Sequence, residues 1–176
     1  MGNNGTRISA NETPAALFRG AQVSKFEGME TTRGLLVFGS TTGATRILAG
    51  AVKKGLHLAG VDVVAKNVLR TKVEELPTFP VLIMGCSTWE NGCLQKDFQR
   101  FKEALGDLRL DGVLAAVFGP GSHSYPHFCR AVDVLEKELV SRGATLAMPS
   151  LRIDGSVYGK RPLAQEWAQG IKDRLI

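Results

Sequence analysis

A hydroxyl-rich loop between Gly39 and Thr45 is the segment whose residue types best suit a chemical role. It follows the apolar run 35–38, which predicts a buried parallel strand, and it precedes a helix expected to begin near Ala44. Free backbone N–H groups and the positive end of the helix dipole would converge on this loop. Hydroxyl donors come from Ser40, Thr41, Thr42 and Thr45. We therefore expect the loop to bind a phosphate group.

Two common phosphate loops do not match this segment. An ATPase-type loop needs Gly-Lys-Ser/Thr, whereas Gly43 is followed by Ala44. The dinucleotide fingerprint Gly-x-Gly-x-x-Gly is approached only at 119–124, which lacks the third glycine. The remaining alternative is an ordinary strand-to-helix turn in which the Ser and Thr residues only cap the helix.

Composition narrows the class of protein. The chain has 176 residues, 44% of them hydrophobic and 22% charged, which suits one domain with a well-formed core. No apolar stretch resembles a membrane span or a secretory signal, so we expect the cytoplasm. The net charge of +5 comes from 22 scattered Lys and Arg residues, which favours a solvated surface over a nucleic-acid footprint.

The cysteine and histidine residues suggest no metal or redox centre. Cys86, Cys93 and Cys129 are odd in number and irregularly spaced, so we expect three small packing residues rather than disulfides or a metal site. His123 and His127 are four residues apart, but no third ligand accompanies them. No constellation of acid, base and nucleophile stands out for catalysis.

From residue 34 onward, strand and helix patterns alternate, which predicts a doubly wound parallel sheet in a three-layer α/β/α sandwich. The expected strands are 35–38, 61–65, 81–85, 113–118 and 145–148, and the expected helices are 44–59, 94–105, 125–142 and 162–175. Gly60, Gly106 and Gly143 suit left-handed caps at helix ends. Such sheets bind ligands at the carboxyl ends of their strands, so the loops after strands one, three and four should line one site.

Residues 1–33 form a polar extension that differs from the domain expected over 34–176. Thr13 would cap a short helix with Pro14 at its first position, and this helix is a candidate docking segment. A disordered tail, or translation that begins at Met29, is the alternative.

The loops after the third and fourth strands each carry one aromatic residue among small ones. The first loop spans 85–92 and contains Trp89, and the second spans 118–125 and ends at Tyr125. Two such rings could clamp a planar ligand, because offset stacking adds roughly 0.5–1.5 kcal/mol per pair beyond area burial. Taken singly, each ring could equally anchor its own loop.

With these three loops in order, the chain resembles the short-chain flavodoxins of sulfate-reducing bacteria over about residues 29–176. The matching motifs are Phe-Gly-Ser-Thr-Thr-Gly at 38–43, Gly-Cys-Ser-Thr-Trp at 85–89, Ser-Tyr at 124–125 with Phe-Cys at 128–129 and Ala-Val-Asp at 131–133, and Leu-Arg-Ile-Asp-Gly at 151–155. The resemblance implies a five-stranded flavodoxin-like sheet, bound FMN, and one-electron transfer between redox partner proteins without an enzymatic reaction of its own.

The resemblance also implies where FMN lies. Its phosphate would occupy the 40–45 loop, its ribityl chain would pass Ser87 and Thr88, and its ring would lie between Trp89 and Tyr125. The full implied set of cofactor-binding residues is Ser40, Thr41, Thr42, Gly43, Ala44, Thr45, Ser87, Thr88, Trp89, Glu90, Asn91, Gly92, Pro120, Gly121, Ser122, Tyr125, Phe128 and Cys129.

Departures from the family pattern predict altered binding and redox behaviour. Ala44 stands where the family usually has asparagine, so one phosphate donor is lost, and Arg46 would add compensating charge. Glu90 is the one acidic residue in the two loops that would hold the ring, 85–92 and 118–125, and Ser122 stands where the family usually has an aspartate. A carboxylate about 7 Å from the ring would oppose the uptake of a second electron by FMN. Each missing carboxylate therefore raises the potential of this second reduction by on the order of 100 mV. We expect a less negative second potential and partners with an acidic docking surface.

The turn after Trp89 is about two residues shorter than in close relatives. In the family, a peptide in this turn flips when the ring takes up one electron. Asn91 and Gly92 tolerate positive φ, so the shorter turn still allows such a flip at 90–91 or 91–92, and a β-branched residue at position 92 should impair it.

Two alternative functions follow from the same residues. The altered loops could open the ring to a small acceptor, as in an FMN-dependent reductase. Alternatively, residues 1–28 could dock the flavoprotein onto a larger assembly such as a protein shell.

Overall fold

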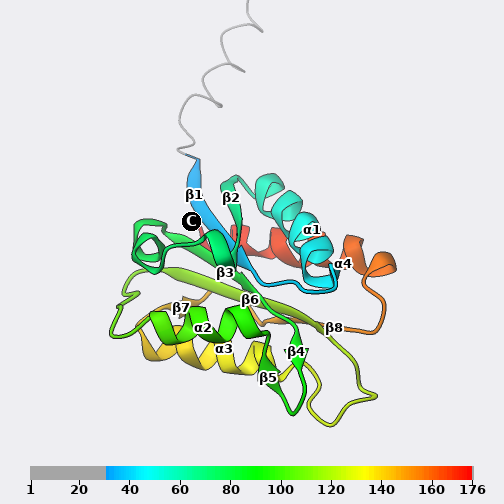
Figure 1. Ribbon diagram of the computed structural model, residues 1–176. Helices are drawn as coiled ribbons and strands as arrows, with labels where there is room; N and C mark the ends of the chain where they lie inside the picture. Colours follow the sequence, from blue (N-terminus) through cyan, green and yellow to red (C-terminus); the bar gives the residue numbers. More distant parts are fainter. Residues whose placement is uncertain (1–30, 176) are drawn as a thin grey trace, which may run out of the picture. The chain divides into compact units, whose positions relative to one another are not determined.

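The computed structural model describes residues 31–175, so the expected docking helix at Thr13 and the alternative start at Met29 lie outside the described residues. The main sheet contains β1 (Thr32–Phe38), β2 (Val61–Asn67), β3 (Val81–Gly85), β6 (Leu114–Gly121), β7 (Thr145–Leu146) and β8 (Leu151–Asp154) (Figure 1). The α-helices are α1 (Ala44–Leu58), α2 (Lys96–Ala104), α3 (Arg130–Ser141) and α4 (Arg161–Gln169). A small hairpin joins β4 (Thr88–Trp89) to β5 (Cys93–Leu94). Short 3₁₀ helices span Val68–Arg70, Val73–Thr78, Tyr158–Lys160 and Gly170–Arg174.

The sheet has the predicted parallel, doubly wound topology. Its order is β2-β1-β3-β6, and both β7 and β8 pair with β6 as two pieces of the fifth strand. Leu36 at the centre of β1 lies beside Ala65 of β2 and Ile83 of β3. The strand order reverses at β1, so the loops after β1 and β3 flank the switch point, where such sheets bind ligands.

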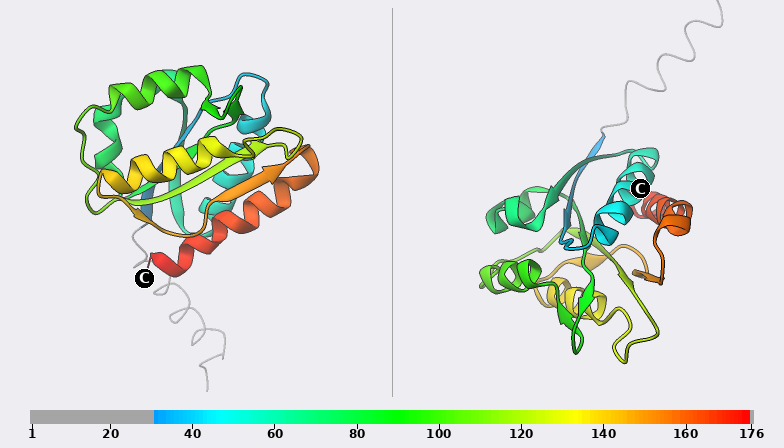
Figure 2. Two further views of the ribbon diagram at one scale, coloured as in Figure 1. Left: turned by 90° about the horizontal axis from the view of Figure 1, so that it is seen from below. Right: turned by 45° about the vertical axis from the view of Figure 1, so that its right-hand side comes forward.

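Helices cover both faces of the sheet, with α1 and α4 on one face and α2 and α3 on the other (Figure 2). Side chains of β1 alternate between two cores: Leu35 and Val37 face α2 and α3, and Leu36 faces α1 and α4. All three are completely buried, which explains why the strand reads as a continuous apolar run. On the α1 side, a β-carbon at Gly55 would lie 2.1 Å from the carbonyl oxygen of Gln165, so close packing of α1 on α4 requires glycine there.

Two of the expected elements are bounded incorrectly. The strand expected at 145–148 ends at Leu146, and pairing with β6 resumes only at Leu151, because Pro149 has no N–H to donate. The helix expected from Tyr125 begins at Arg130, because Cys129 has φ 49, a left-handed conformation that no α-helix continues through. Other boundaries shift by a few residues, and the last helix ends in a 3₁₀ turn.

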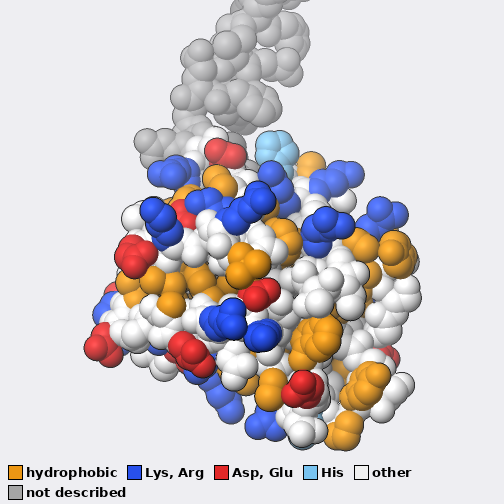
Figure 3. Space-filling view, viewed as in Figure 1, with side chains coloured by type: hydrophobic (Ala, Val, Ile, Leu, Met, Phe, Trp, Pro, Cys, Tyr) orange, Lys and Arg blue, Asp and Glu red, His pale blue; other side chains and the backbone are white. Residues whose placement is uncertain are grey.

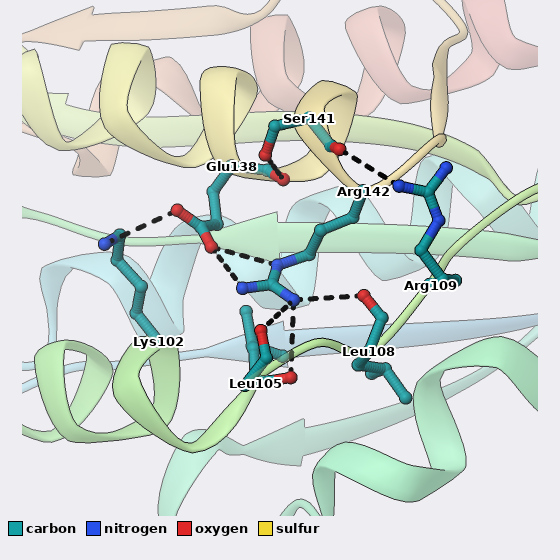
Figure 4. A network of polar contacts seen from close by, with 8 residues as sticks. Lys102, Leu105, Leu108, Arg109, Glu138, Ser141 and Arg142 are labelled. Carbon is teal, nitrogen blue, oxygen red and sulfur yellow. Dashed lines mark hydrogen bonds and ion pairs between the residues drawn. The ribbon is translucent and has the colours of Figure 1, made fainter.

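Helix ends are closed in two ways. Gly60, Gly106 and Gly143 have φ values of 85, 45 and 96, which confirms the predicted left-handed caps. The last turn of α2 is also capped by Arg142 at the end of α3 (Figure 4). Its Nη1 donates to the carbonyl oxygens of Leu105, Gly106 and Leu108 at 3.3, 2.8 and 3.0 Å.

The same guanidinium is held in place by an ion pair on its own helix. Nη2 of Arg142 lies 2.6 Å from Oε1 of Glu138, and Nζ of Lys102 lies 3.4 Å from the other carboxylate oxygen. Because Glu138 balances the charge, Arg142 can hold the carbonyl oxygens of the turn that follows α2. Within residues 31–175, no helix has the length and hydropathy needed to cross a membrane.

Candidate functional site

The loop after β1 is folded around the hydroxyl of Ser40. Its Oγ accepts hydrogen bonds from the backbone N–H of Gly43 at 3.1 Å and of Arg46 at 3.4 Å, which leaves its own O–H proton to donate. Gly43 is the N-cap residue of α1 and has φ 94. Ala44 and Thr45 form the first turn, where N–H groups have no acceptor inside the helix. The loop therefore presents several donors at the positive end of a helix dipole, as an anion requires.

Gln95 anchors this loop from another part of the chain. Its side chain is 3% exposed, and Nε2 donates to Oγ1 of Thr41 at 3.2 Å and to Oδ2 of Asp97 at 2.8 Å. Its Oε1 accepts from the N–H of Phe98 at 3.2 Å and so caps α2. Gln95 does not stand out in the sequence, because the helical periodicity places it inside the expected helix.

The hairpin after β3 fixes the indole of Trp89. Its Nε1 donates to Oγ of Ser87 at 2.9 Å, and the ring remains 38% exposed. The N–H of Gly92 closes the turn on the carbonyl oxygen of Trp89 at 3.1 Å. Gly92 has a φ of 90, which a glycine adopts without strain. The other positive φ in this turn, 44, belongs to Glu90 and not to Asn91. The turn thus places an unfavourable conformation on Glu90.

Thr88 has a structural role that was not expected. Its Oγ1 accepts a hydrogen bond from the N–H of Ala131 at 2.9 Å. Cys129, the N-cap residue of α3, makes no side-chain capping bond, so Thr88 caps that helix from a neighbouring element. The hydroxyls of Ser87 and Thr88 both accept bonds within the protein, and each keeps its own proton to donate to a ligand.

The loop after β6 is tied to β8 through His123. Its Nδ1 lies 3.1 Å from Oδ2 of Asp154, and its backbone N–H donates to Oδ1 at 3.0 Å. These hydrogen bonds lower the pKa of Asp154. The imidazole also stacks on Phe128, with ring centroids 3.7 Å apart. Residues 31–175 contain no cluster of three or more His, Cys, Asp or Glu side chains placed to hold a metal ion.

A groove of about 310 Å³ lies between these two loops. Trp89 lines it from one loop and Tyr125 from the other, so the structure brings the two expected rings together. Tyr125 is 70% exposed, which leaves this end open to solvent. The described residues that line the groove are Thr88, Trp89, Glu90, Gly121, Ser122, Tyr125 and His127, with Glu90 the one carboxylate among them.

Three other expected residues support this groove without lining it. Pro120 is buried in β6, Phe128 packs on His123, and the thiol of Cys129 donates to the carbonyl oxygen of Gly119 at 3.4 Å. Burial raises the pKa of Cys129 to about 11, so its thiol stays protonated at neutral pH.

The packing role expected of the three cysteines is confirmed for two of them. Cys86 and Cys129 are buried packing residues, and burial raises the pKa of Cys86 to about 12. Cys93 is exposed on the hairpin, so the expected packing role is wrong for that residue. Trp167 packs against Phe118 with ring centroids 6.2 Å apart.

The family model that describes flavodoxin matches residues 36–167. The chain belongs to the flavodoxin family. A flavodoxin of Maridesulfovibrio salexigens is 37% identical over 147 residues, which cover 82% of this chain and 99% of that protein. A flavodoxin of Nitratidesulfovibrio vulgaris is also 37% identical, over 76% of this chain and 93% of that protein. Flavodoxins bind FMN and carry electrons between redox partner proteins, so this chain is an FMN-binding electron carrier.

Solved flavodoxin structures agree with this fold. Oxidised flavodoxin 2 from Bacillus cereus superposes with a TM-score of 0.77 at 29% sequence identity, covering 81% of this chain and 99% of that one. A short-chain flavodoxin associated with a non-canonical PDU bacterial microcompartment superposes with a TM-score of 0.76 at 22% identity, which shows the shared fold.

The residues of this chain fit FMN. The 40–45 loop offers a helix N-terminus and hydroxyl donors for a phosphate, and a β-carbon at Gly43 would meet nothing within 4 Å, so the loop is open on that side. The groove between Trp89 and Tyr125 suits a planar aromatic system. When bound, FMN supplies the redox chemistry, and the protein supplies its position and its electrostatic environment.

Proposed function

We propose that this flavodoxin holds FMN across the loops after β1, β3 and β6, with the residues predicted from the sequence as its binding set. The observation that carries this proposal is the groove between Trp89 and Tyr125, on two loops at the carboxyl edge of the sheet where the hydroxyl loop also lies. Within the set, Ser40, Ser87 and Thr88 donate O–H groups. Pro120, Phe128 and Cys129 act by supporting the loop that carries Tyr125.

We further propose that the second reduction potential is less negative than in acidic flavodoxins. Glu90 is the one carboxylate among the described residues of the ring groove, and the nearby Asp154 is paired with His123. An additional carboxylate about 7 Å from the ring would oppose the added electron by roughly 2.4 kcal/mol at an effective dielectric of about 20. This corresponds to about 100 mV before screening by salt.

A single added charge tests this proposal. Ser122→Asp places a carboxylate in the groove lining and should lower the second potential by up to about 100 mV, measured by spectroelectrochemistry of the FMN-loaded protein. Ser124→Asp adds the same charge to the same loop at an exposed position outside the lining, and it should shift the potential much less. Equal shifts in the two variants, or a strongly negative potential in the wild type, would contradict the proposal.

The partner is proposed to be a redox protein with an acidic docking surface, because this chain carries a net charge of +5. The extension was expected to run to residue 33, but Thr32 and Arg33 belong to β1; the segment before β1 is proposed as a separate segment, with residues 1–28 as a docking element for a larger assembly. Co-purification of that assembly with the full chain, lost on deletion of residues 1–28, tests the second idea.

A further inference from the structure

A second groove, of about 760 Å³, lies between α1 and α4. The apolar part of its lining consists of Ile47, Ala51 and Pro162. Tyr158 lies on the rim of the groove and is 68% exposed. None of the described residues that line it also lines the ring groove between Trp89 and Tyr125. The FMN site described above therefore does not account for this second groove.

The charge of this groove is strongly one-sided. Arg46, Lys54 and Arg161 line it, and within residues 31–175 none of these three side chains belongs to an ion pair. Glu166 is the one carboxylate among its described lining residues, and α1 carries no Asp or Glu along its whole length. Lys and Arg side chains gather in the upper part of Figure 3, over the region where Figure 1 places α1.

Two glycines in the groove have no packing reason within the described residues. A β-carbon at Gly50 or Gly159 would meet nothing within 4 Å, whereas one at Gly55 of the same helix α1 would clash with α4. Glycine inside a helix costs stability relative to alanine. Gly50 therefore leaves the helix backbone open to close approach from outside, at a position flanked by unpaired cations.

We propose that the α1–α4 groove binds an acidic segment of a partner protein. Carboxylates of the segment would pair with Lys54 and Arg161, and its backbone would run close to Gly50. The proposal shares an acidic partner with the proposed function but assigns it to a different surface, so either can fail alone. A partner held here would keep the carrier close while the ring edge at Tyr125 stays exposed.

The charge test uses the full chain loaded with FMN. The probe is a fluorescein-labelled peptide of about twelve residues with alternating glutamate and leucine, followed by fluorescence anisotropy. Lys54→Glu combined with Arg161→Glu should weaken binding by at least about tenfold. The matched control is Arg100→Glu with Lys137→Glu, which are exposed, lie outside the groove lining, and change the net charge equally. This control should weaken binding by less than about threefold.

A steric variant separates shape from charge. Gly50→Trp fills the groove without altering its charge and should weaken peptide binding as strongly as the charge reversals, while FMN affinity stays unchanged and the unfolding midpoint does not fall. Equal losses in the groove variants and the matched control, or full binding by Gly50→Trp, would overturn the proposal. Competition by a short DNA duplex with the same dependence on Lys54 and Arg161 would also overturn it, in favour of nucleic acid.

Discussion

The two ends of the FMN site are built in different ways. The phosphate loop is exposed at Thr41 and Thr42 but is held from beneath by buried residues: Thr45 is 1% exposed, and the anchoring Gln95 is 3% exposed. The ring loops are open, with Trp89 38% and Tyr125 70% exposed, and one of them places Glu90 at φ 44. This difference indicates that the phosphate end is fixed by buried anchors, whereas the ring end is left exposed, where electrons can pass to a partner.

The largest expected effect is a loss of FMN affinity caused by a substitution in the phosphate loop. Gly43 has φ 94, which a β-branched residue adopts only at a cost of about 1–3 kcal/mol, so Gly43→Val should reshape the loop and weaken FMN binding by about 10- to 100-fold. Riboflavin, which lacks the phosphate, should bind almost as well as before. Fluorescence titrations of the apoprotein with both flavins measure the difference.

The matched control for that variant is Gly112→Val. Gly112 has φ 80 and open space around its α-carbon, and it lies just before β6 rather than at the carboxyl edge of the sheet. It should lose a similar amount of folding stability but keep its affinity for FMN. If both valine variants lose FMN affinity equally, backbone strain alone is responsible and the phosphate assignment fails.

The same contrast explains how much the sequence could predict. At the phosphate end, strand, glycine, hydroxyls and helix follow one another within a dozen residues, so the pattern reveals the loop directly. At the ring end, Thr88 bonds Ala131 and His123 bonds Asp154, pairs that are 43 and 31 positions apart. No periodicity reports such pairs, and the motif match supplied Trp89 and Tyr125 without showing what holds their loops.

The fold shows the same limit. Strand and helix order follows from hydrophobic periodicity, and the predicted parallel sheet is confirmed. Periodicity failed at the late start of α3, where Cys129 is left-handed, and at the break in the fifth strand around Pro149. Both errors arise from a single backbone conformation or a missing N–H, which a pattern of apolar residues does not record.

A smaller break tests the buried anchor of the phosphate loop. Gln95→Met keeps the side-chain length but removes the donor to Thr41 and the cap on α2, so FMN binding should weaken by about tenfold. Riboflavin affinity should change little, because the anchor acts on the phosphate loop. Gln99→Met, at an exposed position on the same helix, is the control and should behave like the wild type. If Gln95→Met lost affinity for FMN and for riboflavin equally, Gln95 would stabilise the protein in general and not the phosphate loop in particular.

The ring end should respond to pH through Asp154. Its pKa is lowered by the hydrogen bonds from His123, so its stabilising contribution is complete above the ordinary value of 3.8 and is lost as the pH falls through the lowered value. Both side chains are more than half exposed, so the effect is small. Urea unfolding should show Asp154→Asn less stable than the wild type near pH 5.5, with the gap closing below about pH 3. A gap that does not vary with pH would exclude the hydrogen bonds between His123 and Asp154 as its cause.

The smallest expected effect comes from relieving the backbone strain of the turn that follows Trp89. Glu90→Gly removes the cost of a positive φ at a non-glycine residue, about 1–2 kcal/mol, but it adds about 0.5–1 kcal/mol of chain entropy in the unfolded state. The net gain should be about 0.5 kcal/mol in urea unfolding of the apoprotein. Glu90→Ala removes the same carboxylate but keeps the strained backbone, so it should gain nothing. Equal stability of the two variants would mean that the turn stores no strain at Glu90.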